Sequence, residues 1–143
     1  MVKFDDIDSI LRQFGLKVTS LRKKMLTIFI KAKLPLSAYE AFDILKKSQS
    51  NAQPITVYRV IDSFVQQGIL HEIESNNKYI YCSDLTTSLS KHHGVMLFCE
   101  TCLRAFELLD ERIFSLIERF TNQNEFKLKN HLIDIKGTCK KCL

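Results

Sequence analysis

Two Cys-x-x-Cys pairs, Cys99/Cys102 and Cys139/Cys142, stand in the last third of the chain. A gap of two residues lets one tight turn aim both sulfur atoms at the same ion, and two such turns complete a tetrahedral site of four thiolates. The spacing predicts a structural zinc site that joins two distant segments. The alternatives are two disulfides or a dithiol redox site, and the redox site is disfavoured because the pairs flank predicted strands with no Gly-Pro between the cysteines.

Composition places the chain among soluble proteins. Its 143 residues are 45% apolar and 26% charged, enough for one sizeable core or two small ones. The first residues are acidic and amphipathic, unlike a secretion signal, and no apolar run reaches the length of a membrane span. We therefore expect a cytoplasmic chain with no membrane association, whose reduced thiols are available to metal.

Basic residues are concentrated near the N-terminus. Residues 12–39 include no acidic side chain, and the basic ones are Arg12, Lys17, Arg22, Lys23, Lys24, Lys31 and Lys33. A run this one-sided favours a polyanionic partner, most often nucleic acid. A solvated helix face explains the charge pattern equally well when that pattern is taken alone.

The first half of the chain has the spacing of helices. Ser37 and Glu40 form a capping box that opens one helix. Pro54 suits the start of the next, and Gly68 suits its end. This last helix is apolar on one side, whereas its other side is polar and free to contact a partner. The residues of that polar side are Arg59, Asp62, Ser63 and Gln66.

Two β-prone runs follow these helices, at 69–73 and 79–82. Helices followed by a hairpin predict a winged helix-turn-helix domain over residues 1–84, with the helix from Pro54 in the major groove of DNA. The polar segment 85–94 is predicted to be a hinge. Residues 95–143 are predicted to form a small α/β dimerisation domain that contains the four-cysteine zinc site, so the expected fold class is α+β.

The fifth cysteine, Cys82, and several metal-ligating residue types near the same predicted strands suggest a second metal site. Taken alone, a cysteine at a strand end is more often an apolar filler. His71 begins the same hairpin, His92 follows the predicted hinge, and Glu107 lies on a later strand. Sulfur, two nitrogens and an oxygen suit tetrahedral zinc, and the thiolate argues against a site built for iron(II). His71 could instead cap a strand, His92 could be solvated, and Glu107 could lie on an exposed strand face. The choice of His92 over His93 depends on register.

Together these features resemble the ferric uptake regulator family of bacterial metal-sensing repressors. The segments that carry the resemblance are TVYRVIDSFVQQGIL, HEIES, YIYC, HHGVMLFCETC and GTCKKC. The resemblance implies a winged-helix domain joined through a hinge to a dimerisation domain. It is strongest to the zinc-uptake regulators, whose sensing site matches His71, Cys82, His92 and Glu107. It therefore implies two zinc ions per subunit, one structural and one regulatory.

The expected partners are a double-stranded DNA operator and a second copy of the chain. Arg59 is the candidate for a base contact, because a guanidinium can bridge guanine O6 and N7. The resemblance assigns Tyr39 to thymine methyls or the backbone, and Thr56 begins the matching TVYR segment. Tyr58, Lys17 and Arg22 are candidates for phosphate contacts, although packing in the core is an equal alternative for Tyr58.

The predicted function is a zinc-responsive transcriptional repressor, of zinc uptake genes by the resemblance, with zinc as corepressor. An iron- or peroxide-responsive regulator of the same family is the first alternative. A zinc-ribbon module that binds proteins is the second, from a different class. We expect no enzyme and no small organic substrate, because no nucleophile with a base and a pocket is evident.

Overall fold

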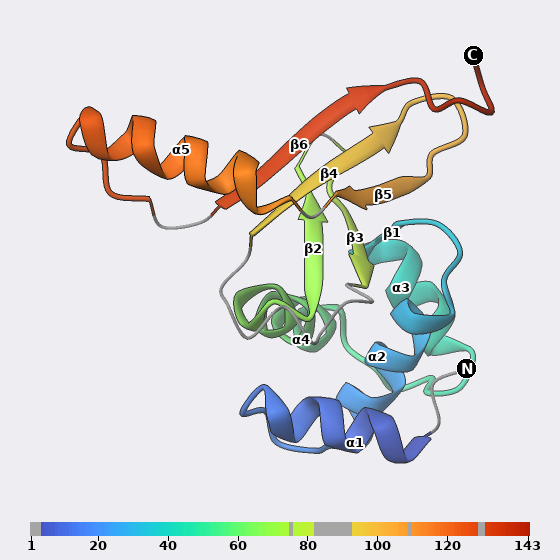
Figure 1. Cartoon of the computed structure of the whole chain (residues 1–143). Coiled ribbons are helices and arrows are strands. Elements are labelled where there is room, and N and C mark those ends of the chain that lie inside the picture. The colour runs from blue at the N-terminus through green and yellow to red at the C-terminus, as the bar shows by residue number, and fades with distance from the viewer. Residues whose placement is uncertain (1–3, 75, 82–92, 109, 129–130) are drawn as a thin grey trace. The chain divides into compact units, whose positions relative to one another are not determined.

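The computed structural model describes residues 4–74, 76–81, 93–108, 110–128 and 131–143 (Figure 1). The chain divides into two compact units, Met1–Ser83 and Asp84–Leu143. Of the predicted hinge, 85–94, only the backbone of the last two residues lies within the described part, at the start of strand β4 (His93–Cys99). None of the described helices is long and apolar enough to cross a bilayer.

The first unit is built on four helices whose ends have local causes. They are α1 (Phe4–Gln13), α2 (Ser20–Lys31), α3 (Ala38–Lys46) and α4 (Pro54–Gln67). Thr19 caps α2, its hydroxyl accepting a hydrogen bond from the backbone of Arg22 at 3.2 Å. Gly68 ends α4 with φ +81°, the left-handed conformation that only glycine adopts without strain.

The core of this unit lies between the helices and the start of the hairpin. Each helix contributes the apolar stripe that its spacing predicts, and the side chains that are fully excluded from solvent include Leu11, Met25, Leu26, Leu45, Ile61 and Phe64. On α4 the buried side chains are Val57, Val60, Ile61 and Phe64. One face of α4 is therefore held by the core, and the opposite face is left to solvent.

A three-stranded sheet closes the unit. Its strands are β1 (Leu36–Ser37), β2 (Leu70–Ile73) and β3 (Lys78–Tyr81), in the order β1-β3-β2, and both pairings are antiparallel. The hairpin was expected, but β1 was not, because two residues carry no periodicity of their own. Strand β1 exists because β3 pairs with it, and Ser37 leads directly into α3.

The second unit has a mixed sheet and one helix. Strands β5 (Ala105–Leu108) and β6 (His131–Gly137) flank β4, antiparallel and parallel respectively, and α5 (Glu111–Gln123) connects β5 to β6 in the sequence. Alternating polarity along residues 126–135 predicts a strand there, and this prediction is wrong at its start. The backbone N–H of Phe126 donates to the carbonyl of Thr121 at 2.8 Å, so Phe126 belongs to the turn that ends α5.

Candidate metal centre and nucleic-acid interface

The four paired cysteines converge at one end of the second unit. Their sulfur atoms all lie within 4.8 Å of one another. Cys99 ends β4, and Cys102 lies in the turn after it; Cys139 and Cys142 lie in the turn after β6. Because β4 and β6 are parallel neighbours with Cys99 opposite Gly137, both turns leave the sheet at the same end. The tertiary structure thus brings the two pairs together as their spacing predicts.

Backbone hydrogen bonds shape the two turns. The N–H of Leu103 and of Cys142 each donate to the carbonyl of the first cysteine of the pair, at 2.9 and 2.8 Å. Leu103 adopts φ +60° to make its turn. The backbone N–H of Cys139 donates to the sulfur of Cys99 at 3.3 Å, which links one pair to the other.

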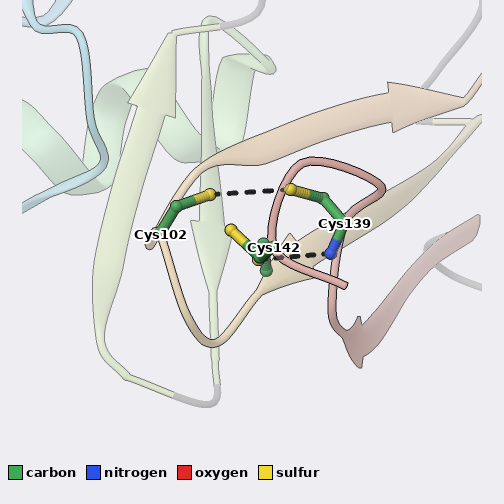
Figure 2. Close-up of side chains that lie close together, drawn as sticks. Cys102, Cys139 and Cys142 are labelled. Carbon is green, nitrogen blue, oxygen red and sulfur yellow. Dashed lines mark hydrogen bonds between the residues drawn. The ribbon is translucent and has the colours of Figure 1, made fainter.

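The distances between sulfur atoms suit a metal site. Cys102 Sγ and Cys139 Sγ are 3.8 Å apart, and Figure 2 shows these side chains and Cys142 pointing toward one another. A disulfide would need about 2.05 Å, and the four cysteines are free. A zinc ion with bonds of about 2.3 Å to four tetrahedral sulfurs would hold them about 3.8 Å apart. The cluster therefore fits four-thiolate zinc and not the disulfide alternative.

The electrostatics of the four thiols are compatible with a divalent cation as their partner. Hydrogen bonds from the backbone of Cys102 and Cys139 lower the pKa of the Cys99 thiol to about 6. The hydrogen bond with Cys139 and burial together raise the pKa of Cys142 to about 12. Four crowded thiols cannot all ionise without a compensating charge. A divalent ion supplies that charge and would leave four thiolates as its ligands.

The structure describes half of the predicted regulatory set. His71 lies on β2 opposite Ile80 and is buried, with 6% of its surface exposed. Glu107 lies on β5 opposite Met96 and is exposed. Cys82 and His92 fall outside the described residues, so this site stays a prediction. The burial of His71 leaves open the alternative that it caps a strand, and the exposure of Glu107 fits the alternative of an exposed strand face.

The predicted DNA-contacting residues fall on exposed surfaces of the first unit. Tyr39 on α3 is 68% exposed, and Tyr58 on α4 is 48% exposed, which disfavours packing of Tyr58 in the core. Thr56 and Arg59 on α4 are exposed as well. Their side chains are therefore available to a ligand that lies along α4.

The basic residues around α2 already have partners within the chain. The Arg22 guanidinium donates to the carbonyl of Lys17 at 3.0 Å. The ammonium of Lys23 pairs with Asp8 at 2.9 Å, and that of Lys24 donates to Gln49 at 3.2 Å. Lys17 is exposed, whereas Arg22 is only partly so. Phosphate contacts by Arg22 would thus come from a side chain already oriented by the turn before α2.

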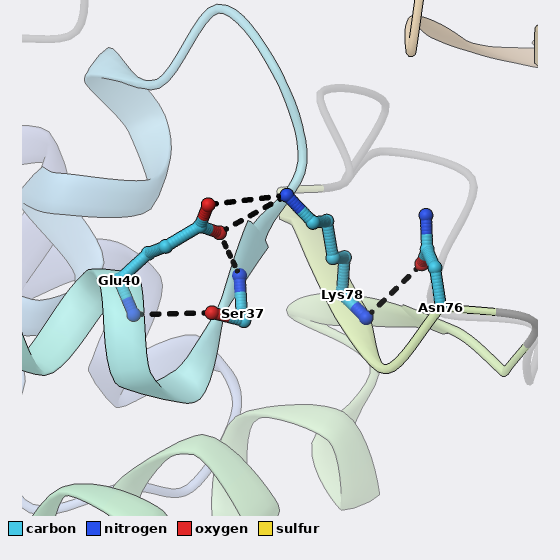
Figure 3. Close-up of polar contacts among 4 residues, drawn as sticks. All are labelled: Ser37, Glu40, Asn76 and Lys78. Atoms are coloured by element: carbon cyan, nitrogen blue, oxygen red, sulfur yellow. Dashed lines mark hydrogen bonds and ion pairs between the residues drawn. The ribbon is translucent and has the colours of Figure 1, made fainter. Parts of the chain in front are cut away.

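A polar cluster ties α3 to the hairpin (Figure 3). Ser37 and Glu40 form the predicted capping box, with bonds of 2.6 and 3.1 Å. The ammonium of Lys78 on β3 donates to both carboxylate oxygens of Glu40 at 3.2 Å. The backbone N–H of Ser37, and then Lys78, lower the pKa of Glu40. The N-terminus of α3, next to Tyr39, is therefore anchored to the β2–β3 hairpin, which is the wing of this unit.

Ile55 is an exposed residue that sequence reasoning overlooked. It is the second residue of α4, and 61% of its surface is exposed. It lies four residues before Arg59 and outside the spacing of the buried stripe. That spacing was a visible signal, because Ile55 and Arg59 share one side of a helix.

A winged helix-turn-helix unit followed by a small α/β unit with four convergent thiols defines a DNA-binding protein with a metal centre. The sequence profile of the Ferric uptake regulator family matches residues 13–136, and the chain belongs to this family. It is a metal-responsive DNA-binding repressor and not an enzyme. This assignment favours DNA over the protein-interaction alternative.

Relatives from two branches of the family are similar over most of the chain. The Zinc uptake regulation protein of Escherichia coli (strain K12) is 28% identical over 138 residues, which are 95% of this chain and 78% of that protein. The Ferric uptake regulation protein of Neisseria gonorrhoeae is 32% identical over 145 residues, or 99% and 96% of the two chains. The solved structure of a zinc uptake regulator complexed with zinc and DNA matches with a TM-score of 0.87 at 27% identity, over 97% and 91% of the two chains.

Proposed function

We propose that the effector is zinc and that the chain represses zinc uptake genes in the cytoplasm when zinc is bound. The proposal is supported by the ligand types that the sequence offers, a thiol at Cys82 and an imidazole at His71, and by the burial of His71. A thiolate with imidazoles and one carboxylate is a zinc-type set, whereas iron(II) favours nitrogen and oxygen. The similarity to a zinc uptake regulator solved with zinc and DNA supports the same choice.

Two zinc ions would serve different purposes. The first, held by Cys99, Cys102, Cys139 and Cys142, has four protein ligands and no open position, which is the arrangement of a structural site. The second would be held by His71, Cys82, His92 and Glu107. Its ligands would be drawn from both units, because His71 belongs to Met1–Ser83 and Glu107 to Asp84–Leu143.

A regulatory ion shared by two units would restrict how they are oriented. In a symmetric dimer this orientation sets the separation of the two α4 helices, which must match the spacing of two half-sites on DNA. Zinc would then raise operator affinity by favouring the binding-competent orientation. An increase of a hundredfold needs about 2.7 kcal/mol, within the range of ordinary coupling free energies.

We propose a homodimer formed through the second unit. Several large apolar side chains there are more than 40% exposed, among them Phe106, Leu108, Leu116, Phe120 and Ile135. Such a group of exposed apolar side chains is typical of a protein interface. Sedimentation velocity of the full chain tests this: Phe120→Glu should shift the dimer toward monomer, and Leu34→Glu, at an exposed leucine of the first unit, should not.

The iron-responsive alternative keeps a specific observation in its favour, the 32% identity to a ferric uptake regulation protein. Metal content and DNA affinity measured on the same samples separate the two effectors. Under the proposal, buffered zinc gives two ions per chain and tight operator binding, and iron(II) under anaerobic conditions does not replace it. Full activation by iron(II) with zinc only in the four-cysteine site would contradict the proposal.

The regulatory ligands are tested by Cys82→Ser. We expect this variant to keep one zinc ion, bind DNA weakly and lose its response to zinc, because a hydroxyl is a poor replacement for a thiolate ligand. A matched control is Ser83→Ala, which alters the neighbouring residue without removing a predicted ligand. Two zinc ions and normal repression in Cys82→Ser would remove Cys82 from the site.

A further inference from the structure

Ile55 has no evident structural reason to be an isoleucine. Its side chain lies in the first turn of α4 and is 61% exposed, so it contributes little to the core. A β-branched residue does not favour the helix either, because its χ1 freedom is restricted there. A single exposed isoleucine is common on protein surfaces, and the position of this one gives it significance.

The position is the exposed side of α4, the helix assigned to the major groove. Ile55 and Arg59 are four residues apart and therefore lie on one side of α4, while Val57 and Ile61 are buried on the other. In helix-turn-helix proteins the N-terminal residues of this helix contact base edges in the major groove. Pro54, Ile55 and Thr56 are all exposed and form the first turn of α4.

An isoleucine can read only one feature of the major groove. Its side chain neither donates nor accepts hydrogen bonds, and the apolar group that base pairs display there is the 5-methyl group of thymine. Along the helix, Ile55 is about 6 Å from Arg59, and successive base pairs are about 3.4 Å apart. The thymine would thus lie within about two base-pair steps of the guanine contacted by Arg59.

We propose that Ile55 is a specificity-determining residue that packs against a thymine methyl group in the operator. This inference rests on the assignment of α4 to the major groove. Tyr39 on α3 is the other candidate for contact with thymine methyl groups, so the two helices would each supply one apolar contact. Ile55 would contribute the contact nearest the Arg59 base.

The test replaces thymine by uracil, which removes only the methyl group. The zinc-loaded full chain selects a duplex from a random DNA library, and each thymine of that duplex is then changed to deoxyuridine. Fluorescence anisotropy gives the affinity of each duplex. For the unmodified chain we expect the DNA affinity to fall about fourfold at one or two thymines, the value of one buried methyl-sized group. These thymines should lie close to the guanine contacted by Arg59, which is identified as the base that Arg59→Ala no longer discriminates.

The Ile55→Ala variant should bind the thymine and uracil duplexes equally at those positions, while Tyr39→Ala should still distinguish them. A matched control is Ile44→Ala, at an isoleucine on α3 that is 40% exposed, which should keep the full fourfold preference. An undiminished preference in Ile55→Ala, or its loss in Ile44→Ala as well, would overturn the proposal. Failure of the zinc-loaded chain to select any duplex would instead refute the proposed role of zinc as the effector.

Discussion

Removal of one zinc thiolate should unfold the second unit and leave the first intact. Cys102→Ser is the perturbation of choice, because Cys102 is partly exposed, whereas Cys99 is buried. Among the described residues of Asp84–Leu143, few apolar side chains are buried, namely Val95, Met96, Phe98, Cys99 and Phe114. The first unit buries a much larger set drawn from four helices.

The magnitudes decide the outcome. A single core in a unit this small rarely supplies more than about 3–5 kcal/mol. Structural zinc contributes about 10–16 kcal/mol in small zinc domains. The metal therefore contributes at least about twice what the core does, and a site with three thiolates and a hydroxyl cannot hold it comparably. The second unit should then lose β4 and β6 together, because both turns of the site extend these strands.

Amide hydrogen exchange followed by mass spectrometry resolves the two units. In Cys102→Ser we expect fast exchange in β4 and β6, continued protection in α2 and α4, one zinc ion or fewer per chain, and monomers by sedimentation. Cys82→Ser is the matched control, since it also removes one thiol and should keep β4 and β6 protected. Protected strands and a stable dimer in Cys102→Ser would refute the structural role of the metal.

Three further outcomes follow from the first unit. Arg59→Ala should keep the fold and zinc content, because the side chain is exposed, and should lose discrimination between operator and random DNA in a titration; unchanged specificity would remove Arg59 as the base contact. Ser37→Ala should cost about 1 kcal/mol and lower the melting temperature of the unit by about 4–8 °C, whereas Glu40→Gln retains the capping box and should cost less; equal losses would contradict the assignment. The fold lowers the pKa of Glu40, so the ionised carboxylate stabilises the folded state. This stabilisation is present above the unfolded pKa near 4.5 and is lost as the pH falls through the folded pKa. In denaturant titrations below pH 4.5, the free energies of unfolding of Glu40→Gln and of the unmodified chain should therefore become more similar.

Local chemistry made much of the first unit predictable. Gly68 ends its helix and Ser37 with Glu40 begins another because these are interactions between residues at most a few positions apart. The second unit was less predictable at residues 126–135, where alternation of polarity indicates a strand. Alternation alone does not reveal that the backbone N–H of Phe126 donates to the carbonyl of Thr121 in the turn after α5. Strand β1 escaped prediction because its reason for existing, pairing with β3, lies about forty positions away.

The candidate site divides in the same way. The spacing of the four paired cysteines predicted one metal centre. Helical periodicity placed Arg59 on the polar side of its helix. Ile55 became a candidate only when the structure showed its exposure, because an isoleucine in a sequence is assumed to be buried.

By itself, the sequence determined which thiols are paired as candidate ligands of one ion and which helix presents a polar side, since turns and helices obey short-range rules. The tertiary structure decided that both cysteine turns leave the sheet at one end and that an anchored wing holds the start of α3. The physical reason is that strand pairing and burial depend on residues that only the folded chain brings together.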